Sequence, residues 1–72
     1  MNVKLRRKAK YYWTGMAKPR GVSMEPFLLT VSRRNPSATW VVESDTERFF
    51  NSLRDAQRYV NTFFEGVKDA QA

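Results

Sequence analysis

An apolar stripe along residues 53–67 constrains the fold more than any other feature. Apolar residues recur there at spacings of three and four, the period of one helix face: Leu53, Ala56, Val60, Phe63 and Val67. Ser52 stands at the N-cap position, and Asp55 follows three residues later in a capping-box pattern. The sequence therefore predicts a helix that begins after Ser52, continues to about Val67 and buries Phe63 in the core.

Three short stretches before this helix have the period-two pattern of strands. They are residues 26–34, 39–44 and 47–51, and turn residues such as Asn35 and Pro36 separate them. An isolated hairpin is marginal in water, whereas a sheet packed on a helix is stable. We therefore predict an α+β fold, with a small three-stranded antiparallel sheet packed on one C-terminal helix.

Trp40 can lie on either face of this sheet. On the side of the helix it belongs to the core, whereas on the other side, with Phe50 or Leu28, it forms an exposed apolar patch of the kind that marks an interface. We favour the core, because a chain of 72 residues has a marginal core and needs its large side chains buried.

The positive charge is concentrated at the N-terminus. Residues 1–24 hold seven basic residues and no acidic one, whereas residues 25–72 hold six basic and seven acidic residues, which together give the net charge of +6. We therefore divide the chain into a basic aromatic arm and linker, 1–24, and a folded body, 25–72. A block of like charge resists compaction, so we expect a flexible arm; a short edge strand at residues 9–16 is the alternative.

The arm and the expected hairpin tip provide the candidate binding residues. Basic side chains contact phosphates or acidic surfaces, and aromatic rings stack on bases or anchor protein interfaces. A solubilising tail is the plain alternative, but tails rarely contain a Tyr-Tyr-Trp sequence. The predicted partner-binding residues are Lys4, Arg6, Arg7, Lys8, Lys10, Tyr11, Tyr12, Trp13, Arg33 and Arg34.

The sequence offers little catalytic chemistry. It contains no histidine and no cysteine, so a histidine-activated nucleophile and a thiolate metal site are both excluded. Glu43, Asp45 and Glu47 form the one acidic cluster, which we interpret as a solvated turn because it lacks the ligand spacing of a calcium loop. We therefore expect a non-enzymatic protein without a catalytic residue, metal, cofactor or small-molecule substrate.

No apolar run approaches the roughly 18 residues of a membrane span, and no apolar region follows the basic N-terminus as in a signal peptide. We therefore expect a cytoplasmic protein with no membrane partner.

The segment around the helix start resembles the end of a βββα DNA-reading domain. The integrase arm-binding and AP2 families share a strand-end aromatic followed by a Ser/Thr-Leu-x-x-Ala helix opening, seen here as Phe50 and Ser52–Ala56. The resemblance implies a sheet that enters the major groove through Arg and Trp side chains. The chain departs from this pattern at Glu43, an acid on the second expected strand.

Taken whole, the chain is similar to the small host-takeover proteins of lytic phages, in its length, missing cysteine, basic arm and compact body. Among them it resembles short transcription regulators of the kind found in a Xanthomonas phage. This resemblance implies binding to the host RNA polymerase, blocked promoter initiation and possible antitermination in the cytoplasm of the host cell. It carries over no residue role.

Three functions follow from these observations. The first is a regulator that binds host RNA polymerase and inhibits or redirects transcription. The second is a small DNA-binding protein of the integrase-arm, AP2 or excisionase-like type, with direct contact to DNA or RNA. The third is an inhibitor of a host defence nuclease. Salt dependence separates the first two, because a DNA-binding protein loses affinity for naked duplex steeply as salt rises.

Overall fold

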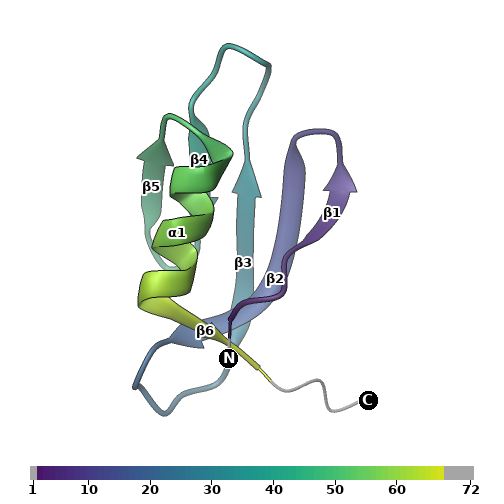
Figure 1. Ribbon diagram of the computed structural model, residues 1–72. Coiled ribbons are helices and arrows are strands. Elements are labelled where there is room, and N and C mark those ends of the chain that lie inside the picture. The colour runs from purple at the N-terminus through teal and green to yellow at the C-terminus, as the bar shows by residue number, and fades with distance from the viewer. Residues whose placement is uncertain (1, 68–72) are drawn as a thin grey trace.

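The computed structural model describes residues 2–67, so Met1 and residues 68–72 of the two expected regions lie outside it. The described chain forms, in order, β1 (Arg6–Ala9), β2 (Tyr12–Pro19), β3 (Phe27–Ser32), β4 (Trp40–Glu43), β5 (Glu47–Phe50), α1 (Leu53–Phe63) and β6 (Phe64–Gly66). The α+β class, the antiparallel sheet and the C-terminal helix are confirmed (Figure 1). The three expected strands are present as β3, β4 and β5.

The predicted number of strands is wrong, because the described sheet has six strands. They follow the order β1-β2-β3-β4-β5, and β6 pairs with β2 in addition. Every pairing is antiparallel. The extra strands come from residues 6–19, where we expected an arm, and from residues 64–66, where we expected the end of the helix.

Strand β2 lies inside the sheet and joins the two expected regions. One of its edges pairs with β3 along Tyr12–Ala17. The other edge is shared, since Thr14 lies opposite Arg6 of β1 and Ala17 lies opposite Gly66 of β6. The division at residue 24 therefore does not separate an arm from the sheet. The alternative of a strand at residues 9–16 is right in part, because residues 12–16 belong to β2, but β2 is paired on both sides and is not an edge strand.

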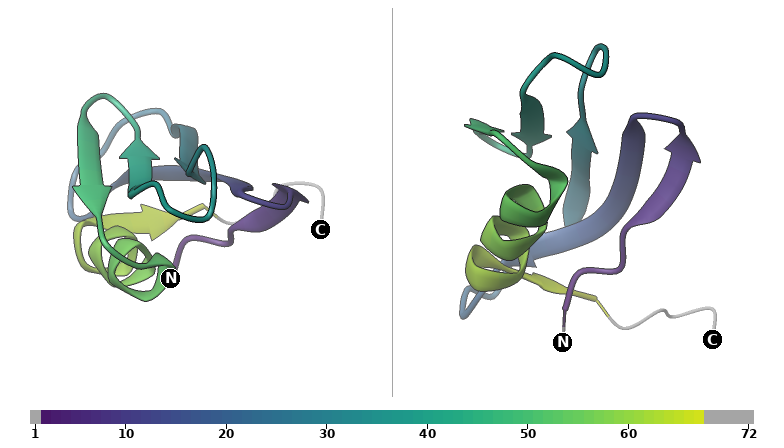
Figure 2. Two further views of the ribbon diagram at one scale, coloured as in Figure 1. Left: turned by 90° about the horizontal axis from the view of Figure 1, so that it is seen from above. Right: turned by 45° about the horizontal axis from the view of Figure 1, so that its top comes forward.

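Glycine at position 15 permits a close approach of the chain to β2. A Cβ atom on Gly15 would lie 2.7 Å from the backbone oxygen of Lys4 and close to the Val3 side chain. The N-terminal segment thus crosses β2 on the side of the helix, as two views show (Figure 2). This crossing buries Val3 and half-buries Leu5, so both residues contribute to the core.

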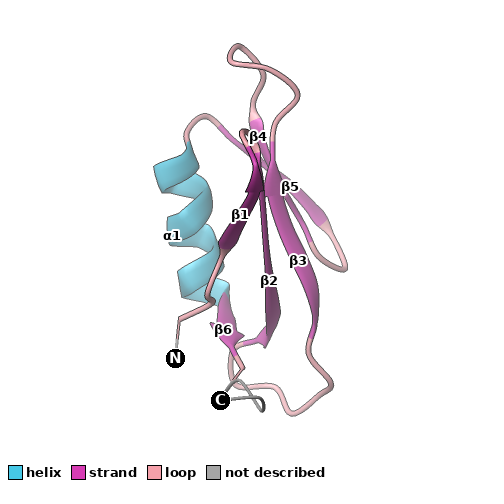
Figure 3. Cartoon of the chain, turned by 90° about the vertical axis from the view of Figure 1, so that its right-hand side faces the viewer, coloured by secondary structure: helices cyan, strands magenta, loops and turns pink. Residues whose placement is uncertain are grey.

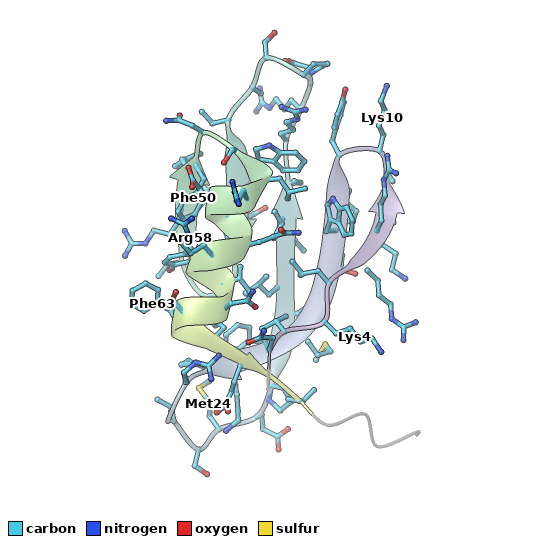
Figure 4. All side chains as sticks on the ribbon, viewed as in Figure 1. Lys4, Lys10, Met24, Phe50, Arg58 and Phe63 are labelled. Carbon is cyan, nitrogen blue, oxygen red and sulfur yellow. The ribbon has the colours of Figure 1, made fainter. Side chains whose placement is uncertain are left out.

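Helix α1 begins as predicted and ends earlier than predicted. The Ser52 hydroxyl accepts a hydrogen bond from the Asp55 backbone N–H at 3.1 Å, which confirms the N-cap. Ala56 and Val60 of the stripe are buried, but Phe63 is 57% exposed and its neighbour Phe64 is 5% exposed. The predicted core position of Phe63 is wrong, and its ring points away from the sheet (Figure 4). The chain becomes extended at Phe64 and carries the Phe64 ring into the core as part of β6.

Arg20 stabilises this early helix end from the β2–β3 loop. Its guanidinium donates hydrogen bonds to the carbonyl oxygens of Asn61 at 2.7 Å and Phe64 at 2.9 Å. Its backbone N–H donates to the Phe63 carbonyl at 3.0 Å. The last turn of α1 contains no basic residue of its own. Arg20 therefore supplies the positive charge and the donors that the last carbonyls of a helix require.

Replacing Arg20 by alanine should lower the free energy of unfolding by about 1–2 kcal/mol, because two charge-assisted hydrogen bonds are lost at a partly exposed site. Chemical denaturation followed by circular dichroism measures this change. Arg54→Ala is the matched control, since Arg54 is exposed in the first turn of α1 and its loss should change stability by less than about 0.5 kcal/mol. Equal effects of the two substitutions would contradict a capping role for Arg20.

Two layers make up the molecule. Helix α1 covers one face of the sheet, and the opposite face lies open (Figure 3). The core between the layers consists of Val3, Ala17, Leu29, Val31, Trp40, Val42, Ala56, Val60 and Phe64. The expected core position of Trp40 is confirmed. Helix α1, the helix found among residues 2–67, is not long and apolar enough to cross a membrane.

Candidate binding surface

The structure separates the aromatic residues of the Tyr-Tyr-Trp sequence. Strand alternation places Tyr12 on the open face, where it is exposed. Trp13 points to the opposite side of β2 and packs half-buried against the core, as does Tyr11 in the turn before β2. Two of the three predicted anchors are therefore engaged within the molecule, and Tyr12 is the one that faces solvent.

The Arg33 guanidinium lies over two aromatic rings of its own chain. Its guanidinium carbon lies 4.7 Å from the ring centroid of Tyr11 and 4.6 Å from that of Trp40. The Nη1 group donates a hydrogen bond to the Pro36 carbonyl at 3.1 Å. A cation over two rings is attracted by the negative potential of each ring face. Arg33 therefore joins the β1–β2 turn to β4, and only Arg34 of the predicted pair is exposed.

Arg7 orders the turn between β1 and β2. Its Nε donates to the Ala9 carbonyl at 3.3 Å, and its Nη2 donates to the Lys10 carbonyl at 3.4 Å. The pairing register shifts between Arg7 and Ala9, which is the mark of a β-bulge. The side chain thus supports the irregular backbone of this hairpin while its charge remains at the surface.

The predicted basic residues of the N-terminus gather along one edge of the sheet. We name them the basic edge: Lys4, Arg6, Arg7, Lys8 and Lys10, all exposed. Lys10 extends from the tip of the hairpin and Lys4 from its side (Figure 4). The ion pair found within residues 2–67 joins Lys18 to Glu65, so it leaves the charge of the basic edge uncompensated. Within that pair, the hydrogen bond from Lys18 lowers the pKa of the Glu65 carboxyl.

The open face of the sheet is a second surface, which was expected from the sequence only as the alternative side for Trp40. Its residues form rows across the strands, because directly opposed residues share a face. One row contains Arg6, Thr14, Thr30, Glu43 and Glu47; the next contains Tyr12, Ser32, Val41 and Phe49; a third contains Met16 and Leu28. We use the name open face for these residues. The alternation of buried and exposed residues along β3 could have indicated this surface, because it places the apolar residue Leu28 on the side that faces solvent.

The comparisons with known proteins came out negative. No protein-family model, no curated protein and no solved structure matches this chain.

The open face contains a hollow beside the β3–β4 loop. The hollow has a volume of about 480 Å³, and its lining includes Arg34, Val41, Glu43, Glu47 and Phe49. The acidic cluster noted in the sequence contributes to this lining, since Glu43 and Glu47 lie opposite each other across β4 and β5. Within the described part of the chain, no group of three His, Cys, Asp or Glu residues can hold a metal ion. The hollow suits an apolar or basic side chain of a partner.

Proposed function

We propose that this chain is a non-enzymatic regulatory protein that docks its basic edge on an acidic surface of bacterial RNA polymerase and alters transcription. The observation that carries the proposal is an edge strand, β1, in which all four residues are exposed and three are basic. The polymerase is named on the strength of the resemblance to the small phage regulators. The proposal leaves the direction of the effect, inhibition or redirection, to the experiment.

The folded basic edge supports a docking role better than a flexible arm does. Its charges are held on a hairpin whose turn is fixed by Arg7 and by the stacking of Tyr11 with Arg33. A preorganised surface loses less conformational entropy on binding than a disordered tail does. An excess of positive charge also speeds the encounter with an acidic partner.

The open face argues against a sheet that reads bases in the major groove. Such a sheet requires donors to base edges and no acids near the phosphates. Here Glu43 and Glu47 stand on the exposed face, whereas Trp40 and Arg33 are engaged on the core side. Contact of the basic edge with nucleic acid is the second candidate function, favoured by the five cations and decided by the same experiment.

Binding kinetics on immobilised bacterial RNA polymerase, with naked duplex DNA as the comparison, test the proposal. We expect the polymerase to be bound more tightly than the duplex at physiological salt. The double variant Lys8→Glu/Lys10→Glu should associate about tenfold more slowly with the polymerase, because it removes steering charge. Its dissociation rate should change less than its association rate.

Arg54→Glu/Arg58→Glu is the matched control, with the same change of net charge on exposed helix positions away from the basic edge. It should leave association within about twofold of the wild type. Tighter binding of the wild type to naked duplex would overturn the adaptor proposal in favour of the DNA-binding one. Equal slowing by both double variants would show that net charge, and not the basic edge, determines binding.

A further inference from the structure

The open face has two clusters of apolar side chains, one at each end of the sheet. Met16 and Leu28 lie opposite each other at one end of the sheet, and Val41 and Phe49 lie opposite each other at the other end. Leu28 is 56% exposed and Phe49 is 61% exposed. A sheet face normally buries its apolar side chains against a second layer. No residue between positions 2 and 67 provides that layer for this face (Figure 3).

The charges of the same face have opposite signs at its two sides. The central row begins with Arg6 on β1, passes through Thr14 and Thr30, and ends with Glu43 and Glu47. Lys4 adds to the basic side, because it lines a hollow of about 240 Å³ together with Arg6 and Met16. The face is therefore basic at β1, neutral in the middle and acidic at β4 and β5.

We propose that a second copy of this chain covers the open face, with the two sheets face to face about a two-fold axis parallel to the strands. This axis reverses the central row, so that Arg6 of each copy lies over Glu47 of the other. A two-fold axis perpendicular to the strands would instead place Arg6 over Arg6. The charge pattern thus selects one isologous arrangement, in which each contact occurs twice.

The same axis brings the apolar clusters of the two copies together. It leaves each residue at its own end of the sheet, and it runs along the central strand β3, so Leu28 of one copy meets Leu28 of the other and each Met16 lies beside that pair. At the opposite end, Tyr12 of each copy comes over Val41 and Phe49 of the other, where the hollow of about 480 Å³ lies. The exposed ring of Tyr12 therefore has a place to insert.

The area of the face limits the strength of this dimer. Five strands spaced about 4.8 Å apart, each rising about 3.3 Å per residue, give a face of roughly 400 Å² per copy. The pair then buries about 800 Å² in total, which is the size of a weak and transient interface. We therefore expect a reversible dimer with a dissociation constant of about 0.1–1 mM.

Analytical ultracentrifugation of the full chain over a concentration series tests the proposal. The wild type should show a monomer–dimer equilibrium that shifts toward monomer as salt rises. Arg6→Glu and Glu47→Arg should each weaken the dimer at least about tenfold, because each places like charges opposite one another twice. A mixture of the two variants should dimerise again. One contact of the mixed dimer joins the introduced glutamate to the introduced arginine, and the other contact joins the native arginine to the native glutamate.

Two controls separate this surface from net charge. Arg54→Glu on the helix and Glu25→Arg in the β2–β3 loop make the same changes of net charge at exposed positions outside the open face. Both should dimerise as the wild type does. A wild type that stays monomeric at millimolar concentration would overturn the proposal, as would a mixture of Arg6→Glu and Glu47→Arg that does not associate. Neither result bears on polymerase binding, which is tested with Lys8 and Lys10.

Discussion

Replacing Leu29 by alanine should lower the free energy of unfolding by about 2–5 kcal/mol, because the substitution leaves a cavity in a fully buried site. Leu29 lies on β3 with Val31, on the face that α1 covers, and neither side chain is exposed. A domain of this size has a total stability of only about 5 kcal/mol or little more. Urea denaturation followed by circular dichroism should therefore show a large loss of folded protein.

Leu28→Ala is the matched control for this experiment. It removes the same atoms from the preceding residue of the same strand, but its side chain points to the open face. Measured at a protein concentration low enough to keep the chain monomeric, it should cost less than about 1 kcal/mol. A cost as large as that of Leu29→Ala would contradict the assignment of the two faces.

Trp40→Ala should cost about 3–5 kcal/mol, because it removes the largest buried side chain and leaves a cavity between β4 and α1. The ring also forms an edge-to-face contact with Tyr11, with centroids 6.4 Å apart, and carries the guanidinium of Arg33. Its loss therefore removes the contacts between the β1–β2 turn and β4, while the backbone hydrogen bond from the Arg33 N–H to the Tyr11 carbonyl at 3.1 Å remains. Chemical denaturation measures the stability of the variant.

The control for Trp40 is Phe49→Ala, an aromatic residue of the neighbouring strand that is exposed on the open face. In dilute solution it should cost less than about 1 kcal/mol. A change below about 1 kcal/mol for Trp40→Ala would show that Trp40 does not contribute to the core as described.

The elements with strong local patterns were predictable from the sequence. Strands β3, β4 and β5 show period-two alternation between turn residues, and the start of α1 is specified by Ser52 and Asp55. These signals lie within a few residues of the elements they specify. The confirmed core position of Trp40 followed from the same alternation, combined with the need of a small domain to bury large side chains.

The remaining elements depend on contacts between distant residues. The charges of β1 indicated a loose arm, but Trp13 and Tyr11 give this hairpin a packing side, which the charge count did not reveal. At the end of α1, Phe63 continues the helical stripe, yet Phe64 takes the core position because it can pair opposite Pro19 of β2. Tertiary pairing overrides the local period there.

The candidate surfaces, too, could be predicted only where they depend on residues close together in the sequence. The cations of the basic edge could be predicted, because a cluster of charged residues in the sequence is apparent whatever fold the chain adopts. The stacking of Arg33 joins residues from the β1–β2 turn and from β4, and the charge pattern of the open face depends on the register of five strands. No local pattern contains the register, so neither feature was predictable.

The shared edge of β2 has a consequence for the order in which the chain folds during synthesis. Strands β1 to β5 pair with their neighbours in sequence, so each can find its partner as it leaves the ribosome. Strand β6 pairs with β2 across more than forty residues, and among residues 2–67 Phe64 is the last residue of the core to be made. Until then the second half of β2 has an unpaired edge and the core is incomplete. The nascent chain is therefore most open to proteases and to strand exchange just before residues 64–66 emerge.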